Sequence, residues 1–146
     1  MASEVKLERV DTRSGLAPED IVGCAFEAFR SREVEELLAL LDPELEFRPV
    51  TALGLTAPTG HGHRAIQQWI EGIDRSGAEP LAVPRAIERV GDDLVLASGV
   101  LSERGRMSGR FAASVAWVFQ VRDGRIVSAF GYPSEAAARR AISDGR

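Results

Sequence analysis

Four side chains of this sequence could take part in acid–base chemistry. His61 and His63 flank Gly62 just ahead of an apolar helical pattern, and an imidazole can exchange protons near neutral pH. Glu88 lies inside a strand pattern, where a buried carboxylate could act as a general base. Tyr132, the single tyrosine, ends the last strand pattern, so its hydroxyl would reach either the mouth of a pocket or solvent. A proton relay, or a general acid or base, is the chemistry that these residue types allow.

Each candidate also has a structural interpretation. Histidines in loops and helix caps can serve as local hydrogen-bonding residues. Glu88 lies near Arg85 and Arg89 in the sequence, so an exposed charge on an edge strand would also explain it. Two histidines with no carboxylate close to them do not make a metal-binding pattern. We therefore expect neither a metal nor a cofactor.

Large apolar side chains are expected to enclose a pocket. Trp117 lies in the middle of an apolar strand pattern, and the alternation of side chains puts it on one face with Val115 and Phe119. Trp69 lies on the apolar face of a helical pattern, where an indole can close one end of a cavity. Simple packing in the core is the alternative for these side chains. The predicted pocket wall comprises Phe26, Phe47, Trp69, Val115, Trp117 and Phe119.

Length and composition indicate one globular unit with no footprint for a polyanion. The chain has 146 residues, of which 45% are hydrophobic and 27% charged, as in ordinary globular proteins. The net charge is -4, and the basic residues are spread along the sequence. Neither nucleic acid nor an anionic membrane is favoured as a partner by this distribution.

The amino-terminal region and the cysteine content favour a reducing compartment. Cys24 is the single cysteine, which excludes an intrachain disulfide, and we interpret it as a small buried residue of a helix. Residues 1–17 are polar and lack the apolar segment of a signal peptide. We expect them to form an arm, with a single domain over residues 18–146, in a cytoplasmic protein.

Helical periodicity predicts three helices in the first half of the chain. Pro18, followed by two acidic residues, is typical of a helix start, and apolar residues then recur at helical spacing to about residue 30. A second helix is predicted over residues 34–41, ended by Pro43. A third is predicted over residues 63–76.

Strand patterns follow these helices. One strand is predicted over residues 45–49, and the segment 51–62, which carries Leu53 and Leu55, is predicted to fold as a loop over something apolar. Pro84 marks an edge strand, because proline cannot donate to a central ladder. An antiparallel meander is predicted over residues 81–90, 94–101, 110–121 and 126–132, with a final helix over residues 135–142.

Two strands of this meander are apolar or small on both faces. LVLASGV and FAASVAWVF lack the alternation of a sheet with one solvated side. If helices cover one face, the other would be an exposed apolar patch. We therefore expect a homodimer formed across the outer face of the sheet.

Three segments resemble the SnoaL-like branch of the nuclear transport factor 2-like superfamily. They are AFEAFRSREVEELLALLDPELEFRP, GHRAIQQWIEG and VAWVFQVRDGRIVSAFGY. They match the family's helix-helix-strand opening, the glycine before its third helix and its closing hairpin around Asp-Gly, and the likeness spans residues 18–142. The resemblance implies an α+β fold, in which N-terminal helices pack on a strongly curved antiparallel sheet to form a cone with an internal pocket. It also implies a homodimer.

Members of this family include ketosteroid isomerases, polyketide cyclases, epoxide hydrolases, dehydratases and modules that only bind partners. The ketosteroid isomerases use a carboxylate near the end of the first strand, a tyrosine in the first helix and a protonated aspartate in the strand before the last. Here Pro49, Ala25 and Trp117 stand at or beside those places. None of them can act as the missing base or stabilise an enolate as a neutral acid or phenol does, so ketosteroid isomerisation by this machinery is disfavoured.

The resemblance and the residues together favour a small-molecule pocket protein that binds a mostly apolar ligand. Acid–base chemistry of an isomerase, cyclase or hydrolase type is left open by the sequence. The alternative is a non-catalytic dimerisation or protein-interaction module whose interior is filled by its own side chains.

Overall fold

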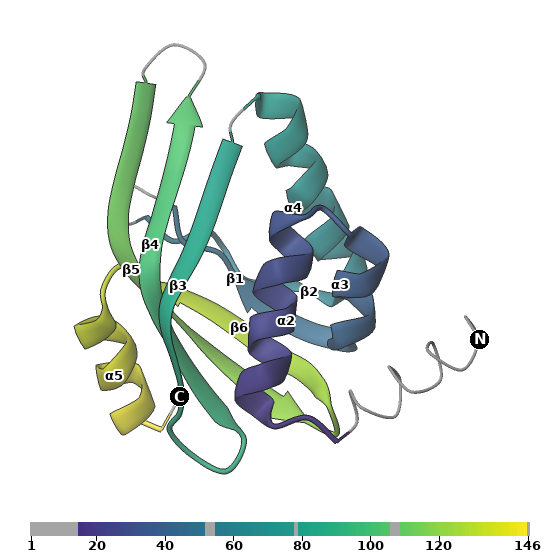
Figure 1. Cartoon of the computed structure of the whole chain (residues 1–146), viewed down its shortest axis with the longest axis vertical. Helices are drawn as coiled ribbons and strands as arrows, with labels where there is room; N and C mark the ends of the chain where they lie inside the picture. The colour runs from purple at the N-terminus through teal and green to yellow at the C-terminus, as the bar shows by residue number, and fades with distance from the viewer. Residues whose placement is uncertain (1–14, 52–54, 78, 106–108, 146) are drawn as a thin grey trace.

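The computed structural model describes residues 15–51, 55–77, 79–105 and 109–145 (Figure 1). Its helices are α2 (Pro18–Arg30), α3 (Val34–Leu40), α4 (Gly62–Ser76) and α5 (Glu135–Ser143). Its strands are β1 (Leu41–Arg48), β2 (Gly60–His61), β3 (Glu79–Arg89), β4 (Leu94–Gly105), β5 (Gly109–Arg122) and β6 (Arg125–Tyr132). Most of the predicted arm, residues 1–17, lies outside the described residues, so the division into an arm and a domain stays a prediction.

The strands form one curled, unclosed sheet in the order β2-β1-β6-β5-β4-β3. The predicted meander is confirmed, because β3, β4, β5 and β6 pair antiparallel in sequence order, and β3 with its Pro84 lies at the edge. One pairing differs from the fully antiparallel sheet that we expected. β1 runs parallel to β6, with Phe47 opposite Ala129, because the chain crosses from β1 to the far edge before the meander returns. The α+β class with a curved sheet is confirmed.

Helix α2 forms as the sequence predicts. Pro18 occupies the first turn, where no amide donor is needed, and Glu19 and Asp20 favour the positive end of the helix dipole. The buried side chains of α2 lie on the face of the helix that packs against the core. Cys24 is exposed, so its interpretation as a buried residue was wrong. Cys24 lies two positions from the buried Val22, which places it about 200° around the helix.

The boundary between α3 and β1 lies earlier than predicted. α3 ends at Leu40, and β1 already begins at Leu41, so the strand includes Pro43. The ladder to β6 accommodates this proline because its register shifts between Leu41 and Glu46.

The predicted loop over residues 51–62 also contains the short strand β2. His61 in β2 lies opposite Glu46 in β1, a pairing between segments whose contact the local sequence pattern does not indicate. Leu53 lies outside the described residues, and Leu55 is 62% exposed. Leu55 therefore does not cover an apolar surface, contrary to our expectation.

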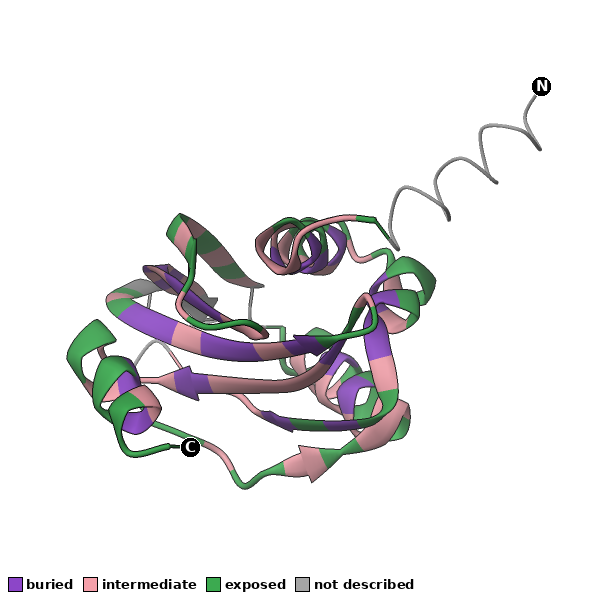
Figure 2. Cartoon of the chain, turned by 90° about the horizontal axis from the view of Figure 1, so that it is seen from below, coloured by how far each residue is buried: buried purple, intermediate pink, exposed green. Residues whose placement is uncertain are grey.

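Each face of the sheet has a cluster of buried apolar side chains, and Figure 2 shows the buried positions along the sheet. The concave face packs against α2, α3 and α4 through the main core, which includes Val95, Ala97 and Phe119. The convex face carries Leu96, which packs beneath α5 in a separate cluster. In Figure 1, α5 lies across the sheet from the other helices. Helices thus cover part of both faces, and the premise that the outer face is bare needs correction. Among the described residues, no helix is long and apolar enough to cross a membrane.

Candidate functional site

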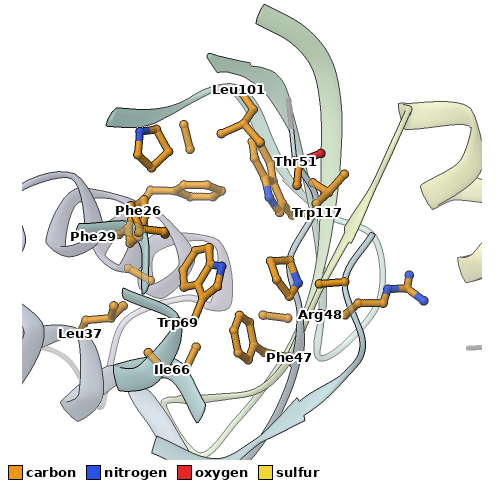
Figure 3. A pocket seen from close by; sticks show the side chains of 18 of the residues that line it. Phe26, Phe29, Leu37, Phe47, Arg48, Thr51, Ile66, Trp69, Leu101 and Trp117 are labelled. Carbon is orange, nitrogen blue, oxygen red and sulfur yellow. The ribbon is translucent and has the colours of Figure 1, made fainter. Parts of the chain in front are cut away.

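A cavity of about 520 Å³ lies between the concave face of the sheet and the helices α2 and α4 (Figure 3). Its volume falls in the range of pockets that hold small organic ligands. Strand alternation directs Leu45, Phe47, Trp117 and Phe119 into it, and α4 contributes side chains spaced three and four residues apart. The cavity therefore follows from the amphipathic patterns of the sequence.

Aromatic rings form the middle of the wall. The Phe26 ring meets Trp117 edge to face at 5.0 Å between centroids. Trp69 stacks on Phe29 at 5.3 Å and meets Phe47 edge to face at 5.3 Å. Such pairs favour these edge-to-face and stacked orientations of the rings in the wall.

Polarity increases from the bottom of the cavity towards its mouth. The buried side chains of the wall are all apolar, and they include Leu37, Leu41 and Ile66. The polar side chains lie in the partly or fully exposed part of the lining. Those among the described residues are Arg48, Thr51, Gln68, Ser76 and Glu103.

Arg48 lines the cavity without presenting its charge to it. Its guanidinium carbon lies 5.2 Å from the centroid of the Phe130 ring and 4.9 Å from that of Tyr132. Its terminal nitrogen donates to the carbonyl oxygen of Gly131 at 3.4 Å. In Figure 3 the side chain extends away from Trp69 and Trp117. The positive charge is thus held against rings on the convex face.

The structure places most of the predicted pocket wall around this cavity. The predicted wall residues that line the cavity are Phe26, Phe47, Trp69, Trp117 and Phe119. Val115 is on the same strand face, but it packs with Val50 and Leu101 and is 2% exposed. It therefore supports the wall from behind and does not line the cavity.

The two histidines have structural partners outside the cavity. His61 is exposed, and its Nε2 lies 4.0 Å from a carboxylate oxygen of Glu46 across the β1–β2 pair. The His63 ring is hydrogen-bonded through Nε2 to the Leu41 carbonyl oxygen at 2.9 Å. This contact fastens the start of α4 to β1, which agrees with the structural interpretation of His63.

Glu88 and Tyr132 also lie away from the cavity wall. Glu88 is exposed and pairs with Arg139 of α5, which bonds Glu135 as well. The hydrogen bonds to Glu135 and Glu88 raise the pKa of the Arg139 guanidinium. Tyr132 packs on the convex face beside α5, beneath the Arg48 guanidinium. These placements fit an edge-strand charge and a packed aromatic ring.

Three residues that the sequence resemblance puts at or beside the functional positions of ketosteroid isomerases line the cavity. They are Ala25, Pro49 and Trp117. Their side chains supply neither a base nor an acid to the interior. Within the described residues, no group of three or more histidine, cysteine, aspartate or glutamate side chains is placed to hold a metal ion.

Glu103 is a charged residue of the cavity lining that our sequence reasoning missed. It lies on β4 two residues beyond Leu101, and both side chains line the cavity. We expected this strand to end at residue 101, whereas it continues to Gly105. Extending the alternation from Leu101 by one step would have placed Glu103 on the concave face.

Comparison with known families agrees with this geometry. The model of the SnoaL-like domain matches residues 24–129, well over half of the chain. The chain belongs to the SnoaL-like domain family. The resemblance inferred from the sequence is thereby confirmed.

Solved structures support the same fold for this SnoaL-like protein. TerC, co-crystallised with polyporic acid, is 19% identical, with a TM-score of 0.68 over 87% of this chain and 99% of TerC. An epoxide hydrolase of the LEH-like kind from M. tuberculosis is 17% identical, with a TM-score of 0.66 over 88% of this chain and 90% of the hydrolase. A candidate polyketide cyclase from Sinorhizobium meliloti is 22% identical, with a TM-score of 0.63 over 77% of this chain and 93% of the cyclase. Identities this low establish the fold alone. A search of curated proteins finds no significant match.

Proposed function

We propose that this SnoaL-like protein binds a mostly apolar small molecule in the cavity between its sheet and helices. The observation that carries the proposal is a space of about 520 Å³ whose buried walls are all apolar. When an apolar ligand replaces the water against such an apolar wall, the free energy of the system falls, and this favours binding. The fold likeness to TerC, which was co-crystallised with polyporic acid, supports the same use of the fold.

The proposal leaves acid–base chemistry of an isomerase, cyclase or hydrolase type open. Ketosteroid isomerisation stays disfavoured, because Ala25, Pro49 and Trp117 provide no base and no neutral oxyanion donor of the family's kind. The alternative is a module without a ligand, which would fill its interior with its own side chains. The open cavity favours the ligand-binding proposal over that alternative.

A substitution at Gly72 tests ligand binding with little risk to the fold. Gly72 lies on the face of α4 that lines the cavity, and a Cβ atom added there meets nothing within 4 Å. We expect Gly72→Phe to obstruct the cavity and to weaken binding of the neutral apolar dye Nile red by about tenfold or more. Trp69 and Trp117 both line the cavity, so quenching of their fluorescence measures the titration.

Gly72→Ala is the matched control. It keeps the cavity open, and it should raise stability by up to about 1 kcal/mol because alanine favours the interior of a helix. Parent and Gly72→Ala should bind the dye alike. Equal binding by all three proteins would place the dye outside the cavity, and no binding by the parent would favour the module without a ligand.

We further propose a homodimer through the part of the convex face that α5 leaves open. Leu81 and Val83 of β3 are each 43% exposed there, which supports an apolar interface. Light scattering at micromolar concentration should give the mass of a dimer for the parent and of a monomer for Val83→Glu. A monomeric parent would contradict the proposed dimer. The cytoplasmic location expected from the sequence stays a prediction.

A further inference from the structure

Glu103 is a carboxylate at the edge of an otherwise apolar part of the cavity wall. It pairs in register with Pro80 of β3, and Pro80 and Ala82 line the cavity beside it. Leu101, two residues earlier on β4, lines the cavity on the same strand face. Glu103 as a residue is half-buried.

Within the described part of the chain, no side chain or backbone group pairs with the Glu103 carboxylate. Two uncharged polar residues of α4, Gln68 and Ser76, also line the cavity. The Ser76 hydroxyl donates to the Ile73 carbonyl oxygen at 2.7 Å. Because the neighbouring wall is apolar, a donor brought to Glu103 would form a stronger hydrogen bond than it would in open water.

Among the described residues that line the cavity, the charge that faces it is therefore negative. Among the described lining residues, Arg48 is the cation, and its guanidinium lies over the rings of Phe130 and Tyr132 on the convex face. A ligand carboxylate at the mouth would approach Glu103 without a described cation to neutralise it. Like charges in a partly dry site repel, whereas a protonated amine or a hydroxyl can donate to the carboxylate.

We propose that Glu103 selects ligands that have an apolar body and a hydrogen-bond donor at the outer end, with protonated amines preferred. The apolar body would occupy the buried end near Leu41 and Ile66, and the donor would face Glu103 at the mouth. This inference rests on the proposed ligand-binding function. It adds that Glu103 is a specificity-determining residue and that the ligand is not an anion at its outer end.

Three probes with one skeleton test the inference. They are 4-phenylbutylamine, 4-phenylbutanol and 4-phenylbutyrate, titrated by calorimetry into the parent protein, Glu103→Gln and Glu88→Gln. The parent should bind the amine most tightly, the alcohol next and the carboxylate most weakly. Glu103→Gln should lower the preference for the amine over the carboxylate by about tenfold, because glutamine keeps the shape and removes the charge.

The control Glu88→Gln removes an exposed carboxylate outside the cavity and should leave the order unchanged. Equal affinities of the three probes for the parent would overturn the role of Glu103, and so would an amine preference that survives Glu103→Gln. If the alcohol binds and Gly72→Phe abolishes its binding, the proposed function stands even when the selectivity fails. If none of the probes nor Nile red binds the parent, the proposed function itself fails, and the inference fails with it.

Discussion

Replacing Gly99 by alanine should lower the free energy of unfolding by about 3 kcal/mol or more. A Cβ atom at this position would overlap the carbonyl oxygen of Val83 and lie 2.8 Å from the Cα atom of Pro84. Both contacts are with backbone of the neighbouring strand, at the register shift that follows Pro84. No side-chain rotation can relieve them, so β3 and β4 would have to separate. Urea unfolding followed by circular dichroism measures the loss.

The control for this prediction is Gly72→Ala, in which the added Cβ meets nothing within 4 Å. The two variants introduce the same methyl group into the same protein, and they should change stability in opposite directions. If Gly99→Ala unfolds at the same urea concentration as the parent, β3 does not approach β4 closely at Gly99.

Leu96→Ala should cost about 2 to 5 kcal/mol, as other large-to-small substitutions in a core do. Leu96 is 1% exposed on the convex face, where it packs in one cluster with Ala116, Val118 and Ala138. Ala138 belongs to α5, so truncation of Leu96 leaves a space beneath that helix. Thermal and urea unfolding measure the loss.

Leu55→Ala is the matched leucine truncation, because Leu55 is 62% exposed. It should change stability by no more than about 0.5 kcal/mol. Similar losses for the two variants would show that α5 does not bury Leu96, and the convex face would then be as bare as the sequence alone suggested.

Local patterns predicted the elements that depend on local physics. The acidic first turn of α2 after Pro18 and the start of α5 at Glu135 both lie where the sequence placed them. The meander followed from alternation and from turn residues such as Asp123-Gly124, which adopt positive φ angles. Periodicity also identified faces, which is why Trp69 and Trp117 could be placed in one pocket wall.

Local sequence patterns could not predict the contacts between segments that lie far apart in the sequence. The parallel pairing of β1 with β6 depends on where the chain returns after β2 and α4, which no single segment encodes. The hydrogen bond from His63 to the Leu41 carbonyl is of the same kind. Glu103 was missed for a different reason, since strand ends are poorly marked when a glycine-rich turn follows. The alternation of side chains along β4 would have predicted that Glu103 lies on the same face as Leu101.

Mapping where a bound apolar probe contacts the protein tests most directly whether apolar ligands bind in the cavity. Isotope-filtered nuclear Overhauser spectra would record contacts between unlabelled Nile red and methyl-labelled protein. Ile66 and Leu101 line the cavity, whereas Leu55 and Val83 are exposed outside it. We expect contacts from the probe to the methyl groups of Ile66 and Leu101 and none to those of Leu55 and Val83. Contacts confined to Leu55 or Val83 would contradict the proposal that this protein binds apolar ligands in its cavity.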